Sequence, residues 1–298
     1  MAVQARLGVD QFFRQAAWLD QIADPVQGAL RGIFTGNGPR GFDVRNFLNG
    51  VWLGHPLHAT ISDFPVGMYT GAVILDVLRL ATANERLEQP ARWCVGLGTA
   101  GALASAVAGL ADYSEVDSPQ RREATVHAAL NIIGTLAFGG SLILRLGSSW
   151  KAAIPLSLIG YALIVAGGDL GGHLVFNLGT LVSREAFSSP PEDFTPVLAA
   201  ADLGERTLKR VDATGMAILL ARVDGRIFAI GDTCTHLGCS LAEGKLHEQG
   251  VECPCHGSRF SLADGAVLQG PASQPELTFE VRERAGQIEV RLSPDSAR

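Results

Sequence analysis

Four long apolar stretches occupy the chain before residue 171, and each approaches the roughly 20 residues that a helix needs to cross a bilayer. They are Ile61–Leu80, Trp93–Ala111, Val126–Leu146 and Ala152–Leu170. The second and fourth carry no Asp, Glu, Lys or Arg until their ends. A helix of a soluble bundle needs a polar stripe, so four membrane-spanning helices are favoured over four buried helices of a soluble protein.

Tryptophans support the membrane interpretation. Trp52, Trp93 and Trp150 all stand next to the ends of apolar stretches, as expected for residues at the membrane–water interface. Hydrophobic residues make up 47% of the chain, and the mean hydropathy is +0.20. The net charge of −6 offers no basic surface for nucleic acid, and the expected partner is the lipid bilayer.

The C-terminal part has the alternating pattern of short strands. Ala217–Val223 and Arg226–Ile230 flank Asp224-Gly225, a favoured two-residue hairpin turn. Leu277–Val281 and Gln287–Leu292 alternate in the same way. We therefore expect a small all-β domain after the helices.

These patterns predict a multi-domain protein, an all-α four-helix transmembrane bundle followed by an all-β domain. The expected divisions are an amphipathic N-terminal segment over 1–50, the transmembrane domain over 51–183, a linker over 184–195 and the β domain over 196–298. Phe12, Phe13, Trp18 and Leu19 are the apolar residues of the N-terminal segment, which we expect on the membrane or against the bundle.

Cysteine and histidine recur in two half-sites of the β domain: Cys234-Thr-His236-Leu-Gly-Cys239 and Cys253-Pro-Cys255-His256-Gly-Ser258. Two thiolates on one iron and two imidazoles on the other can hold a [2Fe–2S] cluster. Neutral imidazole in place of thiolate raises the reduction potential. A zinc site is the alternative for such half-sites, but it leaves two cysteines unused.

The two half-sites resemble the Rieske proteins of quinol-oxidising cytochrome complexes. The resemblance implies that Cys234 and Cys253 bind one iron and that His236 and His256 bind the other. It also implies a disulfide between Cys239 and Cys255, and a hydrogen bond from Ser258 to a bridging sulfide.

Two further positions bear on this resemblance. Gly270-Pro271-Ala272 resembles the family loop that covers the cluster. Phe260 stands where the family often has a tyrosine whose hydroxyl reaches a cysteine sulfur. Hydrogen bonds to the sulfurs raise the potential, so we expect a lower potential than in the most oxidising members.

Four histidines lie outside the cluster motif at the ends of apolar stretches: His55, His58, His127 and His173. An up-down-up-down path of four spans brings these ends to one membrane face. They are either interfacial polar residues or a site for b-type haem, a metal ion or a quinol.

The segment Gly54-His55-Pro56-Leu57-His58, with Asp63-Phe64-Pro65 after it, resembles an uncharacterised bacterial four-span membrane family. That family often occurs fused to a Rieske domain. The resemblance adds architecture but no chemistry.

The predicted function is membrane-bound electron transfer, as a possible oxidoreductase component. One electron would come from a quinol or a haem and pass to a redox protein. An exposed ligand histidine, His236 or His256, would accept a hydrogen bond from the quinol. The alternatives are a redox-sensing membrane module without turnover and a membrane-anchored Rieske ferredoxin component of an oxygenase system.

The expected location is the cell membrane, with multiple spans and the Rieske domain on the same side as the N-terminus. No secretory signal opens the sequence, which favours the cytoplasmic side for both ends. The implied Cys239–Cys255 disulfide argues the other way, because disulfides persist in oxidising compartments.

Overall fold

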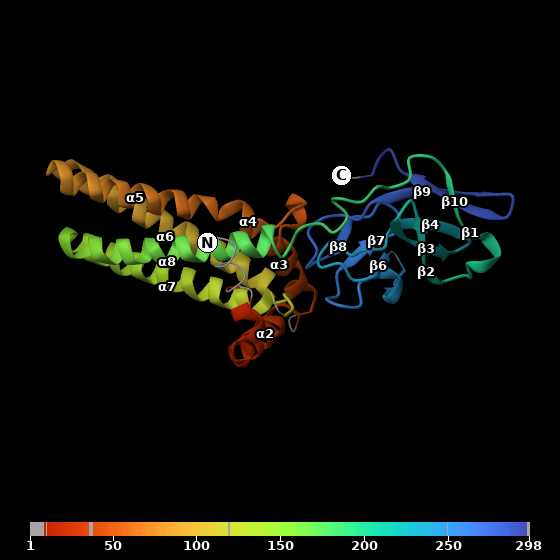
Figure 1. The fold of residues 1–298 in the computed structure, drawn as a ribbon, viewed down its shortest axis with the longest axis horizontal. Coiled ribbons are helices and arrows are strands. Elements are labelled where there is room, and N and C mark those ends of the chain that lie inside the picture. Colours follow the sequence, from red (N-terminus) through yellow and green to blue (C-terminus); the bar gives the residue numbers. More distant parts are fainter. Residues whose placement is uncertain (1–8, 10, 36–37, 119, 249, 297–298) are drawn as a thin grey trace. The chain divides into compact units, whose positions relative to one another are not determined.

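The chain forms two compact units in the computed structural model, which describes residues 9, 11–35, 38–118, 120–248 and 250–296 (Figure 1). The helical unit comprises Met1–Gly36 and Leu57–Thr180, and the β unit comprises Asn37–Pro56 and Leu181–Arg298. The segment Asn37–Pro56 thus joins the C-terminal part of the chain, whereas the sequence-based boundaries divided it between the N-terminal segment and the transmembrane domain.

Four long helices build most of the helical unit. The first is α5 (Asp63–Thr82), which follows the short α4 (Leu57–Ile61). The helix is interrupted between α4 and α5 because Pro65 has no backbone N–H to donate to the Ile61 carbonyl oxygen. The other three are α6 (Glu88–Tyr113), α7 (Gln120–Leu146) and α8 (Trp150–Phe176).

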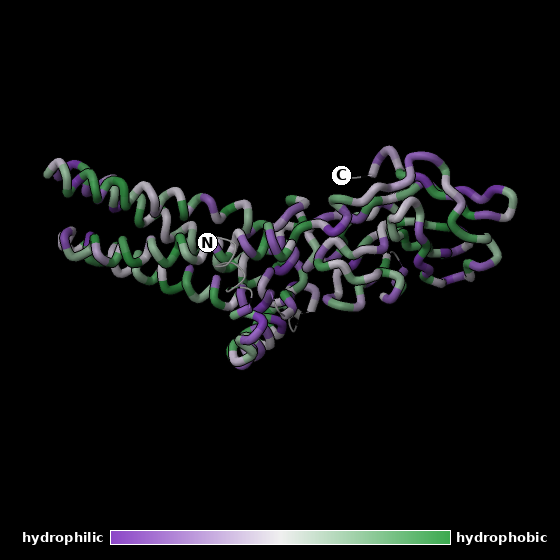
Figure 2. The backbone as a smooth tube through the Cα atoms, in the orientation of Figure 1, coloured by the Kyte–Doolittle hydropathy of each residue, from purple (hydrophilic) through white to green (hydrophobic). Residues whose placement is uncertain are grey.

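Each of these helices is long and apolar enough to span a membrane, with between 22% and 33% of its most apolar window buried inside the protein. The outer faces carry large aliphatic side chains: Leu136 is 69% exposed and Ile143 is 70% exposed. Hydrophobic residues follow the spans along their length in Figure 2. Such surfaces are stable in lipid and unfavourable in water, so the prediction of a multi-pass membrane protein is confirmed.

The interior of the helical unit combines a tight aromatic contact with a buried ion pair. The rings of Tyr69 and Phe138 stack with centroids 3.7 Å apart. Gly98 and Gly160 face these rings at positions where a side chain would clash. Nearer the far ends of α5 and α7, Arg145 forms a bidentate ion pair with Asp76, and both side chains are at most 2% exposed.

An N-terminal helix, α2 (Asp20–Thr35), packs against the spans through polar contacts. Asp20 accepts hydrogen bonds from Arg121 at 2.7 Å and from Arg122 at 2.6 Å, and these bonds hold the pKa of Asp20 well below its usual value. Gln27 donates to the Tyr113 carbonyl oxygen at 2.8 Å. Residues 1–8 and 10 of the predicted amphipathic segment lie outside the described part of the chain.

Two antiparallel sheets form the β unit. The larger has the order β1-β10-β9-β4-β3-β2, and the smaller has the order β5-β6-β7-β8. The larger sheet comprises β1 (Thr195–Ala199), β2 (Leu208–Ala213), β3 (Met216–Val223), β4 (Arg226–Gly231), β9 (Thr278–Arg284) and β10 (Gln287–Leu292). The smaller comprises β5 (Lys245–Leu246), β6 (Gly250–Glu252), β7 (Arg259–Ser261) and β8 (Val267–Gln269).

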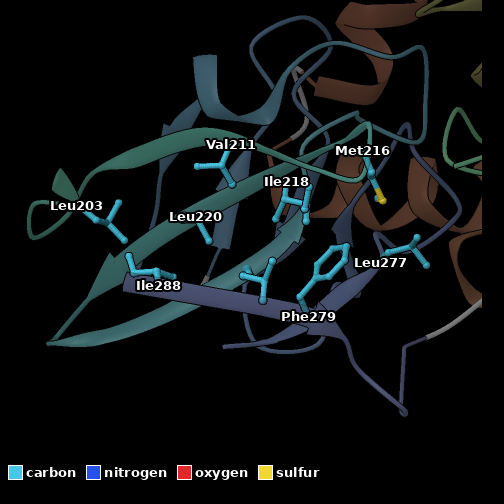
Figure 3. Packing of buried hydrophobic residues seen from close by; sticks show 11 residues of the cluster. Leu203, Val211, Met216, Ile218, Leu220, Leu277, Phe279 and Ile288 are labelled. Carbon is cyan, nitrogen blue, oxygen red and sulfur yellow. The ribbon is translucent and has the colours of Figure 1, made fainter. Parts of the chain in front are cut away.

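Three hairpins fix the register of the larger sheet, and each turns on a residue followed by glycine. The turns are Thr214-Gly215, Asp224-Gly225 and Ala285-Gly286, and all six residues have positive φ. This geometry matches the twist of the flanking strands. The inward-facing side chains pack into one apolar core, in which Ile218 and Phe279 point toward each other (Figure 3). The predicted all-β fold is confirmed.

Candidate metal centre

Three loops at one end of the β unit carry the residues singled out from the sequence. Loop 1 (232–240) follows β4, loop 2 (253–258) joins β6 to β7, and loop 3 (270–276) leads from β8 to β9. Loops 1 and 2 each contain one half-site, and loop 3 contains the Gly270-Pro271-Ala272 sequence.

Loops 1 and 2 repeat the same backbone geometry. The amide of Gly238 donates to the Cys234 carbonyl oxygen at 2.8 Å, and the amide of Gly257 donates to that of Cys253 at 3.1 Å. Both glycines have positive φ, at 92° and 72°, which side chains disfavour. Each turn encloses the histidine of its half-site, two residues after Cys234 in loop 1 and three residues after Cys253 in loop 2.

The two half-sites meet through their side chains. Cys234 and Cys253 are both free thiols, 1% and 2% exposed. The rings of His236 and His256 lie 4.9 Å apart between centroids, at an interplanar angle of 80°. His236 is only 3% exposed, and neither ring nitrogen has a hydrogen-bond partner among the described residues. Buried imidazole nitrogens without partners are costly, unless they bind a ligand.

The pKa shifts of Cys253 and His236 also favour metal binding. A hydrogen bond from Cys234 lowers the pKa of Cys253 to about 6, and the same contact raises the pKa of Cys234. Burial, followed by the neighbouring His256 and the guanidinium groups of Arg45 and Arg184, lowers the pKa of His236 to about 3. Thiolate and neutral imidazole are the protonation states in which these side chains bind metals.

A disulfide joins loop 1 to loop 2. Cys239 and Cys255 form it with their Cα atoms 6.5 Å apart, as the resemblance implies. The Cys253 sulfur lies within 4.8 Å of both disulfide sulfurs. Because those two sulfurs are bonded to each other, they are not available as thiolate ligands, and the free sulfurs are those of Cys234 and Cys253.

Ser258 and Phe260 are buried residues at the end of loop 2 and in β7. Ser258 is fully buried, and its Oγ accepts a hydrogen bond from the Ala272 amide of loop 3 at 2.9 Å. The hydroxyl proton therefore remains available for a sulfide of a bound cluster. Phe260 is fully buried in the same apolar cluster as Cys234 and Cys253, and the lower potential expected from its missing hydroxyl stays a prediction.

A helix from before the membrane spans secures loop 3. This helix, α3 (Pro39–Asn49), belongs to the β unit. Arg45, 2% exposed, donates to the Gly270 carbonyl oxygen at 2.6 Å, and the Gly270 amide donates to Asn46 at 2.8 Å. These two residues were not predicted as part of the site, because no local sequence pattern marks them.

Two buried carboxyl groups lie behind loop 1. Glu276 accepts from the Thr235 amide at 2.9 Å, and Glu185 accepts from the Leu277 amide at 3.1 Å. Burial raises the pKa of Glu185 to about 7 and raises that of Glu276 well above its usual value. A cavity of about 610 Å³ adjoins Glu185, with Gln274 in its wall.

The four histidines outside the motif fall in both units of the chain. His58 and His127 lie close together in the helical unit, with ring centroids 6.3 Å apart. His173 pairs with Glu123 at 2.9 Å, a residue that the sequence analysis did not single out. His55 belongs to the β unit. A haem, metal or quinol site among them stays a prediction.

Two family models match the chain over adjoining stretches. Residues 193–284 match the Rieske [2Fe-2S] domain. Residues 54–184 match a family described as "Predicted membrane protein (DUF2231)". The boundary between them falls between residues 184 and 193, after the last span has ended at Phe176, and the two matches agree with the fusion inferred from the sequence.

Curated relatives match the Rieske part. Ferredoxin CarAc of Metapseudomonas resinovorans is 39% identical over 95 residues, which cover 32% of this chain and 89% of the relative. The 3-phenylpropionate/cinnamic acid dioxygenase ferredoxin subunit of Escherichia coli (strain K12) is 39% identical over 93 residues, which cover 31% of this chain and 87% of the relative.

Solved structures match the same region. A complex of reduced oxygenase and oxidized ferredoxin in carbazole 1,9a-dioxygenase contains a chain 35% identical to this protein, with a TM-score of 0.32, over 33% of this chain and 92% of that one. The Sphingomonas yanoikuyae B1 ferredoxin is 26% identical, with a TM-score of 0.32, over 34% of this chain and 100% of that one.

The donor set in loops 1 and 2 fits a [2Fe–2S] cluster, since it combines two buried thiols with two adjacent imidazoles. The relatives that match this region are electron-transfer ferredoxins, so the protein is an electron-transfer protein with a [2Fe–2S] cluster. The chain belongs to the Rieske [2Fe–2S] domain family, and it carries this domain behind a four-span membrane domain of the DUF2231 family.

Proposed function

We propose that Cys234 and Cys253 bind one iron of the cluster and that His236 and His256 bind the other. The observation that carries this assignment is the meeting of two buried free thiols and two adjacent imidazoles in otherwise equivalent loops. Cys94 is also free, but it lies on α6 in the helical unit, whereas both half-sites belong to the β unit. A cluster of this kind supplies a one-electron redox couple at about −150 to +300 mV.

The surrounding residues divide the site into a sealed side and an accessible side. His236 is sealed, whereas His256 is only partly buried, so His256 is the ligand through which a partner or a quinol makes contact. Loop 3 excludes water from the buried side, and α3 secures that loop through Gly270. The disulfide keeps loops 1 and 2 together while the redox state changes.

The protein then works as a membrane-anchored single-electron carrier. Its acceptor is a redox protein, since the matched relatives are ferredoxins, one of them a dioxygenase subunit. Its donor is a quinol or a haem, as the membrane domain gives access to either. A second candidate is a ferredoxin component of an oxygenase system that takes electrons from a soluble reductase, and the 39% identity to such a subunit favours it.

The Rieske part would lie on the same membrane side as the segment before the first span. Contacts between α3 and loop 3 support this placement, because both belong to one unit and four spans separate them in the chain. We place this side in the cytoplasm. Accessibility of a reporter fused after residue 298 to an impermeant reagent tests the placement, and labelling only from outside contradicts it.

The ligand assignment is tested by electron paramagnetic resonance of the full chain purified in detergent. Cys234→Ser and Cys253→Ser should each remove the signal of the reduced cluster. Cys94→Ser should leave it unchanged. Cys239→Ser, at the disulfide, should retain the signal at lower yield. A full signal in either ligand variant refutes the assignment.

The donor is identified by mixing the oxidised protein either with a quinol, or with a reduced pyridine nucleotide and a ferredoxin reductase, and measuring reduction of the cluster. Reduction of the cluster by quinol alone supports the first candidate. Reduction that requires the reductase supports the second. If neither system reduces the cluster but dithionite does, the carrier function with these donors is refuted.

A further inference from the structure

The helical unit contains a repeat of two helical hairpins. The first span of one hairpin comprises α4 and α5, and the first span of the other is α7. Equivalent residues of these two spans form three contacting pairs: His58 with His127, Tyr69 with Phe138, and Asp76 with Arg145. Each pair is separated by the same 69 residues along the chain. Equivalent residues of two repeats contact each other only at the axis that relates the repeats. The three pairs therefore lie along that axis.

The second helix of each hairpin repeats as well. Gly98 faces the Tyr69 ring and Gly160 faces the Phe138 ring. Seven residues on, the Ser105 and Gly167 carbonyl oxygens contact the two histidines. Four residues further, Gly109 and Gly171 lie against the same imidazoles so closely that a Cβ would approach within 2.9 Å. Each imidazole thus packs against the backbone of an equivalent glycine.

The hydrogen bonds determine which nitrogen of each ring carries the proton. His58 Nδ1 lies 2.9 Å from the Ser105 carbonyl oxygen, and His127 Nδ1 lies 2.7 Å from that of Gly167. A carbonyl oxygen only accepts, so Nδ1 is the donor in both rings and Nε2 carries the lone pair. The Ser105 hydroxyl, 3.1 Å from His58 Nδ1, can accept as well, and the Asn131 amide, 3.4 Å from His127 Nδ1, donates to the His127 carbonyl oxygen at 2.8 Å. No hydrogen bond of the described residues uses either Nε2 atom. Histidines that bind metals are oriented in this way, with the other nitrogen donating to a carbonyl.

The separation of the rings matches two ligands on opposite sides of one ion. Metal–nitrogen bonds are about 2.0–2.1 Å long, and with roughly 1 Å from each nitrogen to its ring centre they span about 6 Å. The observed centroid distance is 6.3 Å. The interplanar angle of 90° is compatible with two imidazoles that share one axis.

We propose that Nε2 of His58 and Nε2 of His127 together bind one transition-metal ion on the axis of the repeat. Among the described residues, no third His, Cys, Asp or Glu completes a compact ligand group with them. The remaining coordination positions belong to ligands from outside the chain, which are the nitrogens of a haem macrocycle or the waters of a free ion. His173 is directed to Glu123 instead.

The test measures metal content and optical spectra of the full chain purified in detergent, with acid-labile sulfide as the internal measure of the cluster. We expect one metal equivalent beyond the two cluster irons. A Soret band and a haemochrome assay identify haem iron. Without them, elemental analysis identifies a free ion. Protein that lacks the extra metal is titrated with haemin and, separately, with Cu²⁺ and Zn²⁺.

Four variants distinguish ligation from a structural role. His58→Ala and His127→Ala should each lower the extra metal at least tenfold, while the cluster signal stays at the wild-type level. His55→Ala, three residues away in the same motif, should retain the metal. Imidazole added to His58→Gly should restore the spectrum, which it does only where a ligand is missing. The inference is overturned if wild-type protein holds cluster iron alone and binds no probe, or if both alanine variants retain the metal. Neither result affects the cluster assignment, which the resonance signal reports separately.

Discussion

The ion pair of Asp76 with Arg145 should be a principal source of stability in the helical unit. Both side chains are at most 2% exposed. Two guanidinium nitrogens bind the two carboxylate oxygens, and Trp150 donates to the same carboxylate at 3.3 Å. Arg145 also donates to Ser141 and Ser157, both at 3.2 Å. Because every polar group here is buried and partnered, removing one charge leaves the other without compensation.

We expect Asp76→Asn to lower the free energy of unfolding by about 3–5 kcal/mol, the usual cost of breaking a buried ion pair. Arg145→Gln should cost less, since Trp150 still donates to the remaining carboxylate. The double variant Asp76→Asn/Arg145→Gln should be more stable than the sum of the single effects by about 2–3 kcal/mol, because no charge is left unpaired.

The assay is equilibrium unfolding of the detergent-purified chain followed by far-ultraviolet circular dichroism, which reports the helices. Glu85→Gln is the matched control, since Glu85 is 84% exposed and pairs with Arg79 at 3.4 Å. It should cost at most about 1 kcal/mol. If the single effects of Asp76 and Arg145 add within about 0.5 kcal/mol, the two charges are not coupled and the reasoning is refuted.

Three further predictions concern the β unit. Cys239→Ala/Cys255→Ala should lower the stability of the cluster-free unit by about 3 kcal/mol in chemical unfolding, as expected for a closed loop of 16 residues; an unchanged midpoint would contradict this. Arg45→Gln should lower the electron affinity roughly tenfold, a shift of about −59 mV for one electron in a redox titration, and an upward shift would show that its charge does not favour the reduced state. The pKa of Glu185, raised to about 7, makes its neutral form stabilising: its contribution is complete below pH 4.5 and is lost as the pH rises through 7. Glu185→Gln should therefore retain stability above pH 7 that the wild type loses, and parallel pH profiles would refute this.

Much of the fold could be predicted from the sequence because its signals are local. A membrane span is set by hydropathy over about 20 consecutive residues, and the predicted first span differs from α5 by two residues at each end. The hairpins follow from a glycine at a position that requires positive φ. The cluster motif could be recognised because its ligands lie within two short loops.

The missed contacts join residues that are distant in the chain and carry no pattern. His173 meets Glu123 across 50 residues, and Arg45 meets Gly270 across 225. The repeat of the two hairpins did leave a signal, since His58 and His127 have the same spacing as the aromatic residues Tyr69 and Phe138. The third pair concealed it, because the repeat puts opposite charges at equivalent positions, Asp76 and Arg145.

The position of α3 in the chain has a consequence for protein synthesis. Arg45 emerges from the ribosome 225 residues before Gly270. At about 5–20 residues per second, roughly 10–45 s pass between the synthesis of α3 and that of loop 3. All four spans are made in that interval. A soluble fragment that starts at residue 181 would lack α3 altogether and would leave loop 3 without its clamp. Fragments intended for crystallisation should therefore carry residues 38–56, joined to the N-terminal side of the β strands by a flexible linker.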